Sequence, residues 1–171
     1  MPRLILMRHA KAERPTDAPD DLSRRLVERG RRAAAEAAER MAAFGLSPTA
    51  ALVSPSARTR ETWESAKRAF DNPPIPEIVD ALYESSVQTI WEAWRAAAAD
   101  KPESITLIIG HNPGMQDLIA RLLRQAHDGS EAARRMQEHL PTSGFAAFTI
   151  GGETLHAAGP ALIGWGRLQG D

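Results

Sequence analysis

Two arginines and two histidines have the residue types and positions for an anion site. Arg8 and His9 directly follow one short apolar run, His111 directly follows another, and Arg58 lies within a predicted helix. Two guanidinium groups offer paired donors that suit a tetrahedral oxyanion such as phosphate. A neutral imidazole among these cations can attack phosphorus, because the neighbouring charges lower its proton affinity and leave a nitrogen lone pair free. A second histidine can donate to the phosphoryl oxygens in the transition state. The pattern therefore predicts phosphoryl transfer through a phosphohistidine, without a metal.

Short apolar runs that end in polar residues predict buried strands. The predicted strands cover residues 4–7, 51–53 and 105–109, with a short edge strand at 75–79 and a hairpin of 145–150 with 154–158. Apolar residues at helical spacing predict helices over 26–44, 57–70 and 115–122, a further helix that begins after Ser86, and a polar helix over about 130–139.

Strands that alternate with helices predict an α/β fold of three layers, in which a mostly parallel sheet has helices on both faces. In such sheets the ligand crevice lies at the carboxyl ends of the strands, and His9, Ser54 and His111 fall at such ends. We expect the sheet to bring them together, although they are far apart in the chain. Since there is no internal repeat and no long linker, we predict that residues 1–171 form a single domain.

The composition excludes several classes of protein. The 171 residues include 21 Lys plus Arg against 22 Asp plus Glu, and a net charge of −1 argues against a general binder of nucleic acid or of a membrane surface. The absence of cysteine excludes a disulfide scaffold, a thiol nucleophile and Cys-based metal sites. No stretch approaches the roughly 18 apolar residues of a membrane span, and the first residues do not resemble a signal peptide. We therefore expect a cytoplasmic protein.

The same residues resemble the motifs of the histidine phosphatase superfamily, also called phosphoglycerate mutase-like. Residues 6–10, Leu-Met-Arg-His-Ala, resemble the family's strand followed by Arg-His-Gly, with Ala10 in place of glycine. Residues 54–62 resemble the Ser-Pro-x-x-Arg-x-x-x-Thr block, and residues 110–112 resemble the late Gly-His motif. The order and spacing of these motifs over nearly the whole chain make the match specific.

Within the superfamily the chain looks most like the SixA-type phosphohistidine phosphatases, because of its short length, its Arg-His-Ala-Lys-Ala start and its His-Asn-Pro-Gly block. Residues 21–30 also resemble the Asp-x-x-Arg-Pro-Leu-Thr-x-x-Gly segment of that family, with Arg25 in place of proline and Val27 in place of threonine. Since Val27 cannot supply a hydroxyl N-cap, we expect the first helix to begin differently. Residues 141–144 resemble the turn before the family's last strands.

The resemblance implies that His9 is the phosphorylated nucleophile and that Arg8, Arg58 and His111 hold the phosphoryl group, with no metal or other cofactor. Glu84 occupies the region where many superfamily members place the acid that protonates the leaving group. A carboxylate that begins a helix and interacts with its dipole is the alternative for Glu84. A phosphoester leaves as an alkoxide and needs that proton more than phosphohistidine does, so replacing Glu84 should separate the two substrate classes.

The short chain leaves little room for the insertions that cover the site in larger superfamily members. An open site favours a histidine-phosphorylated protein as substrate. Two other functions stay open: a general phosphomonoesterase that acts on small phosphate esters with the same nucleophile, and a non-catalytic phosphate-binding module. Both histidines and both arginines are present, which argues against the module, because binding alone does not need a nucleophile.

The other histidines and the tryptophans suggest alternatives that are weaker. His127, His139 and His156 lack the spacing of a metal site, so we expect them at the surface. Trp91 and Trp94 fall on an apolar helical face, which favours core packing over a stacking platform for bases.

The polar residues of two loops also have plain interpretations. The acidic residues between 17 and 21 are typical of a solvated loop. Ser54 or Ser56 with His111 as base would suggest a serine hydrolase, but neither serine lies in a Gly-x-Ser-x-Gly elbow, and Pro55 makes the turn wrong for one.

Overall fold

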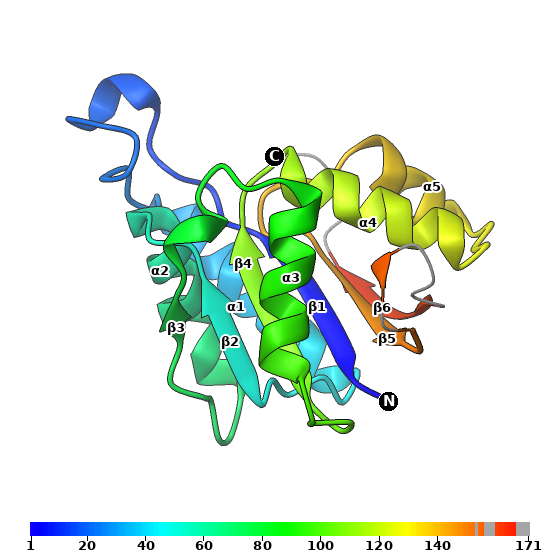
Figure 1. Ribbon diagram of the computed structural model, residues 1–171. Helices are drawn as coiled ribbons and strands as arrows, with labels where there is room; N and C mark the ends of the chain where they lie inside the picture. The colour runs from blue at the N-terminus through cyan, green and yellow to red at the C-terminus, as the bar shows by residue number, and fades with distance from the viewer. Residues whose placement is uncertain (153, 156–159, 167–171) are drawn as a thin grey trace.

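The computed structural model describes residues 1–152, 154–155 and 160–166, which form an α/β fold with a mixed six-stranded sheet (Figure 1). In sheet order the strands are β3 (Glu77–Ile78), β2 (Ala50–Val53), β4 (Ile105–Gly110), β1 (Arg3–Arg8), β5 (Phe145–Ile150) and β6 (Pro160–Gly166). The first four strands in this order are parallel, and β5 and β6 are antiparallel to their neighbours. The three-layer, mostly parallel arrangement agrees with the prediction.

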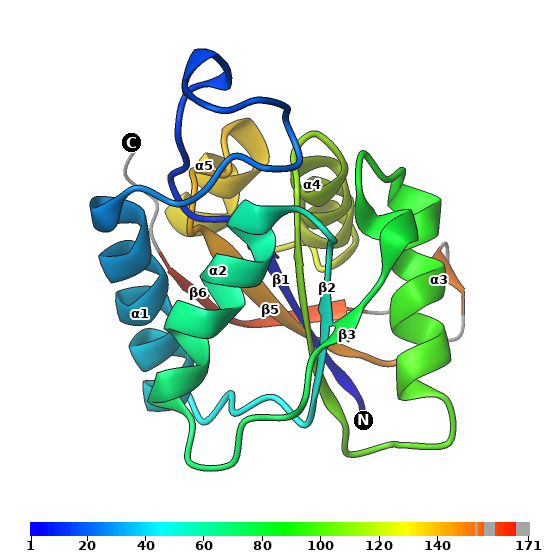
Figure 2. The same ribbon diagram turned by 90° about the vertical axis from the view of Figure 1, so that its left-hand side faces the viewer.

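Helices cover both faces of the sheet (Figure 2). One face carries α1 (Glu28–Ala43) and α2 (Ala57–Ala66), and the other carries α3 (Val87–Ala98), α4 (Gly114–Gln125) and α5 (Glu131–Glu138). Short 3₁₀ helices occur at Pro15–Asp17, Lys67–Ala69 and Asp80–Leu82. Among the described residues, no helix has both the length and the apolar character needed to cross a membrane.

Alternation along β1 divides the core into two apolar clusters. Ile5 and Met7 pack under α1 and α2, whereas Leu4 and Leu6 pack under the helices of the opposite face. All four side chains are fully buried. Burying each of them contributes about 1.5–3 kcal/mol, so the centre of the sheet is held firmly from both sides. The residues at the end of β1 therefore have a rigid support.

Serine residues cap three of the helices. Ser86 caps α3 as predicted, Ser130 caps α5, and Ser56 caps α2 with its hydroxyl accepting from the backbone N–H of Thr59. Val27 precedes α1 and makes no side-chain cap. The expectation that the first helix begins without a hydroxyl N-cap is confirmed.

The prediction for the final hairpin was wrong in its second strand. Thr154 and Leu155 are not in a strand, residues 156–158 lie outside the described residues, and the strand that pairs with β5 is β6. Glycines explain the error, because Gly164 and Gly166 weaken the strand signal in the sequence. They are needed for packing, since a Cβ on Gly166 would lie 2.4 Å from the ring of Phe145.

The order of the strands creates a topological switch point at the carboxyl ends of β1 and β4, the place where a crevice forms in open α/β sheets. From β1 the chain crosses to β2 through α1 on one face of the sheet, and from β4 it crosses to β5 through α4 and α5 on the other. The two connections leave neighbouring strands in opposite directions. Such switch points are where open α/β sheets bind ligands.

Candidate active site

His9 and His111 lie side by side at this crevice. Arg8 at the end of β1 pairs with Gly110 at the end of β4, so the next residue of each strand is a histidine. The backbone N–H of His9 donates to the carbonyl oxygen of Gly110 at 3.0 Å, and the two imidazole rings are 5.3 Å apart between centroids. The parallel register thus brings together two residues that are far apart in the chain.

His9 has a defined tautomer. Its Nδ1 lies 2.8 Å from the carbonyl oxygen of Ala10, and because a carbonyl only accepts, Nδ1 carries the hydrogen and Nε2 keeps its lone pair. Burial, with smaller contributions from His111, Arg58 and Arg8, lowers the pKa of His9 to about 3, so the ring is neutral near pH 7. Ala10 is itself fully buried in the cluster under α1 and α2, where its methyl group packs.

Arg58 reaches the crevice from the first turn of α2 and is buried. Its NH1 donates to the carbonyl oxygen of Asp21 at 2.6 Å, and its NH2 donates to the Asp21 carboxylate at 2.9 Å. The same NH2 lies 3.3 Å from Nδ1 of His111. Nε of Arg58 is buried and has no hydrogen-bond partner among the described residues. Asp21 thus occupies the end of the guanidinium fork, and the Nε edge is left for an anion.

Arg8 is held from the side of β5. Its NH1 donates to the carbonyl oxygen of Leu140 at 2.9 Å, and its backbone N–H donates to that of Gly144 at 3.0 Å. The backbone N–H of Ser143 donates to the carbonyl oxygen of His9. Ser143 is fully buried and has a left-handed backbone with φ of 60°. The turn at 141–144, which the sequence resemblance singled out, closes the site next to Arg8 and His9.

His111 is held on three sides. Ser54, at the end of β2, has its hydroxyl 2.7 Å from Nε2 of His111, and Arg58 lies at Nδ1. The ring of Tyr83 meets the His111 ring edge-on, with centroids 5.5 Å apart. Burial and, to a smaller extent, the charge of Arg58 lower the pKa of His111 to about 4. The second imidazole is therefore also neutral near pH 7.

Two residues that the sequence prediction missed complete this network. The carboxylate of Asp21 accepts hydrogen bonds from Tyr83 at 2.6 Å, from Arg24 at 2.9 Å and from Arg58. The hydrogen bond from Tyr83, followed by those from the arginines, holds the pKa of Asp21 well below its usual range, and the same bond raises the pKa of Tyr83. Asp21 lies in an exposed loop, as predicted, but its contacts with Arg58 and Tyr83 were not foreseen. The sequence feature that could have indicated a role for Asp21 is segment 21–30, which resembles a motif of the family.

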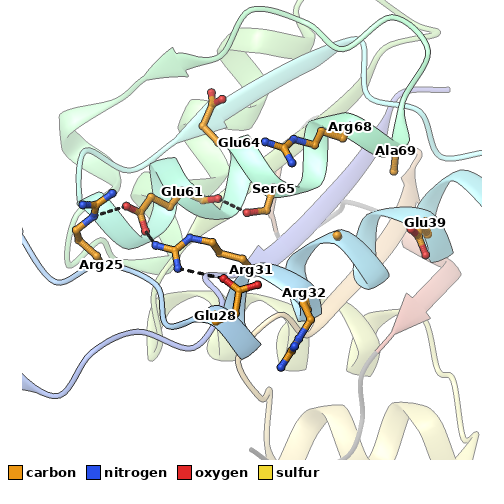
Figure 3. Close-up of a pocket in the computed structure, with 11 residues that line it drawn as sticks. Arg25, Glu28, Arg31, Arg32, Glu39, Glu61, Glu64, Ser65, Arg68 and Ala69 are labelled. Carbon is orange, nitrogen blue, oxygen red and sulfur yellow. Dashed lines mark hydrogen bonds and ion pairs between the residues drawn. The ribbon is translucent and has the colours of Figure 1, made fainter.

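The loop that carries Asp21 is anchored to α2. Glu61, one turn after Arg58, accepts from Nε of Arg25 at 2.6 Å, from the backbone N–H of Leu26 at 2.8 Å and from Arg31 at 3.3 Å. These contacts lie in a charged groove of about 640 Å³ between α1 and α2 (Figure 3). The anchor keeps the loop beside the first turn of α2, where Asp21 meets Arg58.

Glu84 follows Tyr83 in the chain and is exposed. Its backbone is left-handed, with φ of 50°, which is uncommon for a residue other than glycine. The alternative interpretation of Glu84 as the start of a helix was wrong, because α3 begins at Val87 after the Ser86 cap. Glu84 is the chain neighbour of Tyr83, whose ring contacts His111.

The other histidines and the tryptophans that the structure describes lie where the sequence suggested. His127 and His139 are exposed, and His156 lies outside the described residues. Trp91 and Trp94 are buried and their rings pack together, with centroids 4.6 Å apart. Within the part of the chain that the structure describes, no group of three or more His, Asp or Glu side chains is arranged to hold a metal ion.

Comparison with known proteins agrees with this geometry. Residues 4–117 match the model of the histidine phosphatase superfamily (branch 1). A candidate phosphohistidine phosphatase SixA from Nakamurella multipartitia has 28% sequence identity and a TM-score of 0.80, over 96% of this chain and 95% of that chain. A second one, from Agrobacterium tumefaciens, has 26% identity and a TM-score of 0.76, over 96% and 97%. An uncharacterised protein of Mycobacterium leprae is 29% identical over 153 residues, which are 88% of this chain and 91% of that protein.

Proposed function

Because the chain belongs to the histidine phosphatase superfamily (branch 1) and is a phosphatase, we propose that it hydrolyses phosphohistidine in a protein substrate. The similar proteins of Nakamurella multipartitia and Agrobacterium tumefaciens carry the name of phosphohistidine phosphatases, which favours this substrate over other phosphate groups. A cytoplasmic location belongs to the same proposal.

The hydrogen bond between Nδ1 of His9 and the carbonyl oxygen of Ala10 carries the proposal. It leaves Nε2 as the nitrogen with a lone pair, and the lowered pKa keeps that lone pair free of a proton. An orienting partner on one nitrogen and a free lone pair on the other are what a nucleophilic imidazole needs. His9 is therefore the residue that becomes phosphorylated.

The reaction proceeds in two displacements at phosphorus. Nε2 of His9 forms a P–N bond while the P–N bond to the substrate imidazole breaks, and the leaving imidazole takes up a proton. Water then attacks phosphorus, the P–N bond to His9 breaks with its electron pair returning to Nε2, and inorganic phosphate leaves. Neither step requires a metal, because the site cations carry the charge of the transferring group.

Three residues stabilise that charge. Arg8 and Arg58 supply guanidinium donors, of which Nε of Arg58 is buried without another described partner. His111 supplies a neutral imidazole N–H, 5.3 Å from the His9 ring between centroids. Preorganised donors of this kind stabilise a transition state more than mobile ones do, because they need no rearrangement during the reaction.

Glu84 is the proposed proton donor for leaving groups that depart as strong bases. Its exposed side chain, next in sequence to Tyr83 of the site, suits contact with a leaving group that points to solvent. The imidazole of phosphohistidine depends on this proton less than an alkoxide does. Glu84 is therefore more important for phosphate esters than for the proposed substrate.

Phosphate release tests the proposed function. Wild type and His9→Asn are compared, with a chelator present, on a histidine-phosphorylated carrier protein and on an aryl phosphate, and His139→Asn serves as the control for an exposed histidine. We expect release from the phosphohistidine protein to dominate and to disappear in His9→Asn alone. Preference for the aryl ester would instead identify a small-molecule phosphomonoesterase, and no release from either substrate would identify a binding module.

A further inference from the structure

Ser54 and His111 form a buried hydrogen-bonded pair, in which His111 belongs to the candidate site and Ser54 contacts its ring. The Ser54 hydroxyl oxygen lies 2.7 Å from Nε2 of His111, and Ser54 is fully buried. The two residues follow neighbouring strands, β2 and β4. Which of them donates depends on the nitrogen of His111 that carries the hydrogen, and this can be inferred from the other partners of both groups.

The hydroxyl of Ser54 needs an acceptor. Among the described residues, Nε2 of His111 is its only hydrogen-bond partner. If Nε2 carried the hydrogen, Ser54 would accept it, and the serine O–H would remain buried with no acceptor, which is costly in a protein interior. If Ser54 donates to Nε2, its hydroxyl is satisfied. The hydrogen of the neutral His111 ring must then be on Nδ1.

The opposite side of the ring agrees with an anion-bound site. In the structure NH2 of Arg58 donates to Nδ1 of His111 at 3.3 Å, because a guanidinium can only donate, and this long hydrogen bond alone favours hydrogen on Nε2. An oxyanion that accepts from NH2 of Arg58 removes this bond, so that Nδ1 can carry the hydrogen. With hydrogen on Nδ1, both groups are donors that point into the same space. Nε of Arg58, buried and without a described partner, is a third donor nearby. An oxyanion would accept from all of them.

We propose that Ser54 is a positioning residue, which donates to Nε2 of His111 and so keeps Nδ1–H directed at the phosphoryl group. The inference rests on the proposed function and deepens it, because it names the nitrogen of His111 that serves the transition state. It also explains why a serine beside a histidine does not act as a nucleophile here. The Ser54 oxygen lies at Nε2 of the His111 ring, and the Ser54 hydroxyl donates its hydrogen to that nitrogen.

Nitrogen NMR of protein labelled with ¹⁵N-histidine, saturated with inorganic phosphate near pH 7, tests the inference directly. We expect the His111 resonances of wild type to report hydrogen on Nδ1. In Ser54→Ala this preference should be lost. Ser56→Ala is the matched control, since it removes a neighbouring buried hydroxyl that caps α2 without touching His111; it should leave the tautomer of His111 unchanged.

Steady-state kinetics of Ser54 variants provide a second test. Ser54→Ala should lower kcat about tenfold or more with a smaller change in KM, because the lost orientation matters most in the transition state. Ser54→Thr, which keeps the hydroxyl, should restore both the tautomer and most of kcat. If Ser54→Ala does not fold, Ser54→Cys occupies nearly the same volume with a weaker donor, and should show a reduced preference for Nδ1–H.

Two results would overturn the inference: hydrogen on Nε2 of His111 in phosphate-bound wild type, or an unchanged tautomer in Ser54→Ala. Because NMR reads the tautomer without turnover, the two proposals fail separately. A wild type with hydrogen on Nδ1 that releases no phosphate from any substrate would contradict the proposed function and support the assignment of Ser54.

Discussion

Asp21 holds Arg58 at two points, with its carbonyl oxygen 2.6 Å from NH1 and its carboxylate 2.9 Å from NH2. The contact joins a loop residue to the first turn of α2. It orients the guanidinium so that the Nε edge stays available. A residue of an exposed loop therefore determines the orientation of Arg58, the arginine that we propose binds phosphate.

The first prediction concerns this contact. Asp21→Asn removes the charge that holds Arg58, and hydrogen bonds to charged groups contribute about 1.5–3 kcal/mol, so we expect kcat/KM to fall about 10-fold to 100-fold. Steady-state kinetics on the phosphohistidine protein provide the measurement. Asp20→Asn is the control, because in the described structure the Asp20 side chain accepts only from the Ser23 backbone, in an exposed loop. An Asp21→Asn enzyme as active as wild type would show that Arg58 does not need this orientation.

Tyr83 offers an optical test of the same network, because it is the only tyrosine in the chain. Its hydrogen bond to Asp21 raises the pKa of the phenol above the ordinary value. In Asp21→Asn the negative charge is gone, so the pKa should return toward that of a free tyrosine. Titration of the tyrosinate absorbance in both proteins measures the shift. Equal pKa values in the two proteins would contradict the contact.

The site histidines predict how stability depends on pH. The folded protein keeps His9 neutral down to about pH 3 and His111 down to about pH 4, whereas unfolded histidine protonates near 6.5. Between about pH 6.5 and pH 4 the unfolded state binds more protons, so the free energy of unfolding falls as the pH falls. Asp21 has a lowered pKa, so its contribution to the free energy of unfolding is lost only below the ordinary pKa of a carboxyl group. That loss falls outside most of this pH window.

Urea unfolding at several pH values across this window measures the effect. His9→Asn removes one of the two histidines with a lowered pKa, so its free energy of unfolding should decrease less steeply with acid than that of wild type. His139→Asn, in which an exposed histidine is replaced, should follow the wild-type slope. Equal slopes for His9→Asn and wild type would mean that His9 is not kept neutral by the fold.

Replacement of Glu84 distinguishes substrate classes. In Glu84→Gln we expect hydrolysis of an alkyl phosphate to fall by about 10²-fold, the usual contribution of a general acid, while hydrolysis of phosphohistidine changes much less. The variant keeps a residue with the same backbone preferences at φ of 50°, so the local conformation is retained. Parallel assays of both substrates give the ratio. Equal losses on both, or none, would remove Glu84 from the role of proton donor.

The positions of His9 and His111 were predictable, because each residue directly follows a strand that the local sequence indicates. Short apolar runs ending in Arg8-His9 and Gly110-His111 indicate strands, and a parallel register brings such ends together. The structure has this register, with Arg8 opposite Gly110. No contact between side chains had to be foreseen, since the pairing of the backbones alone brings the two imidazoles into the same crevice.

Contacts between loops were not predictable in the same way. Asp21 and Tyr83 are 62 residues apart and meet through two irregular segments, one after β1 and one before α3. Loop conformation depends on distant anchors such as Glu61, which leave no periodic signal in the sequence. The strand β6 was missed for a related reason, because Gly164 and Gly166 fit close packing against Phe44 and Phe145, respectively, rather than strand propensity.

The central claim is that His9 becomes covalently phosphorylated. Wild type is mixed briefly with the histidine-phosphorylated carrier protein, quenched in alkali, which preserves phosphohistidine, and analysed by peptide mass spectrometry. We predict one phosphoryl group on the peptide that contains His9, linked to the imidazole, and none on that peptide in His9→Asn. Phosphate released at the wild-type rate with no phosphoryl group at His9, or a phosphoryl group on another residue, would contradict the account.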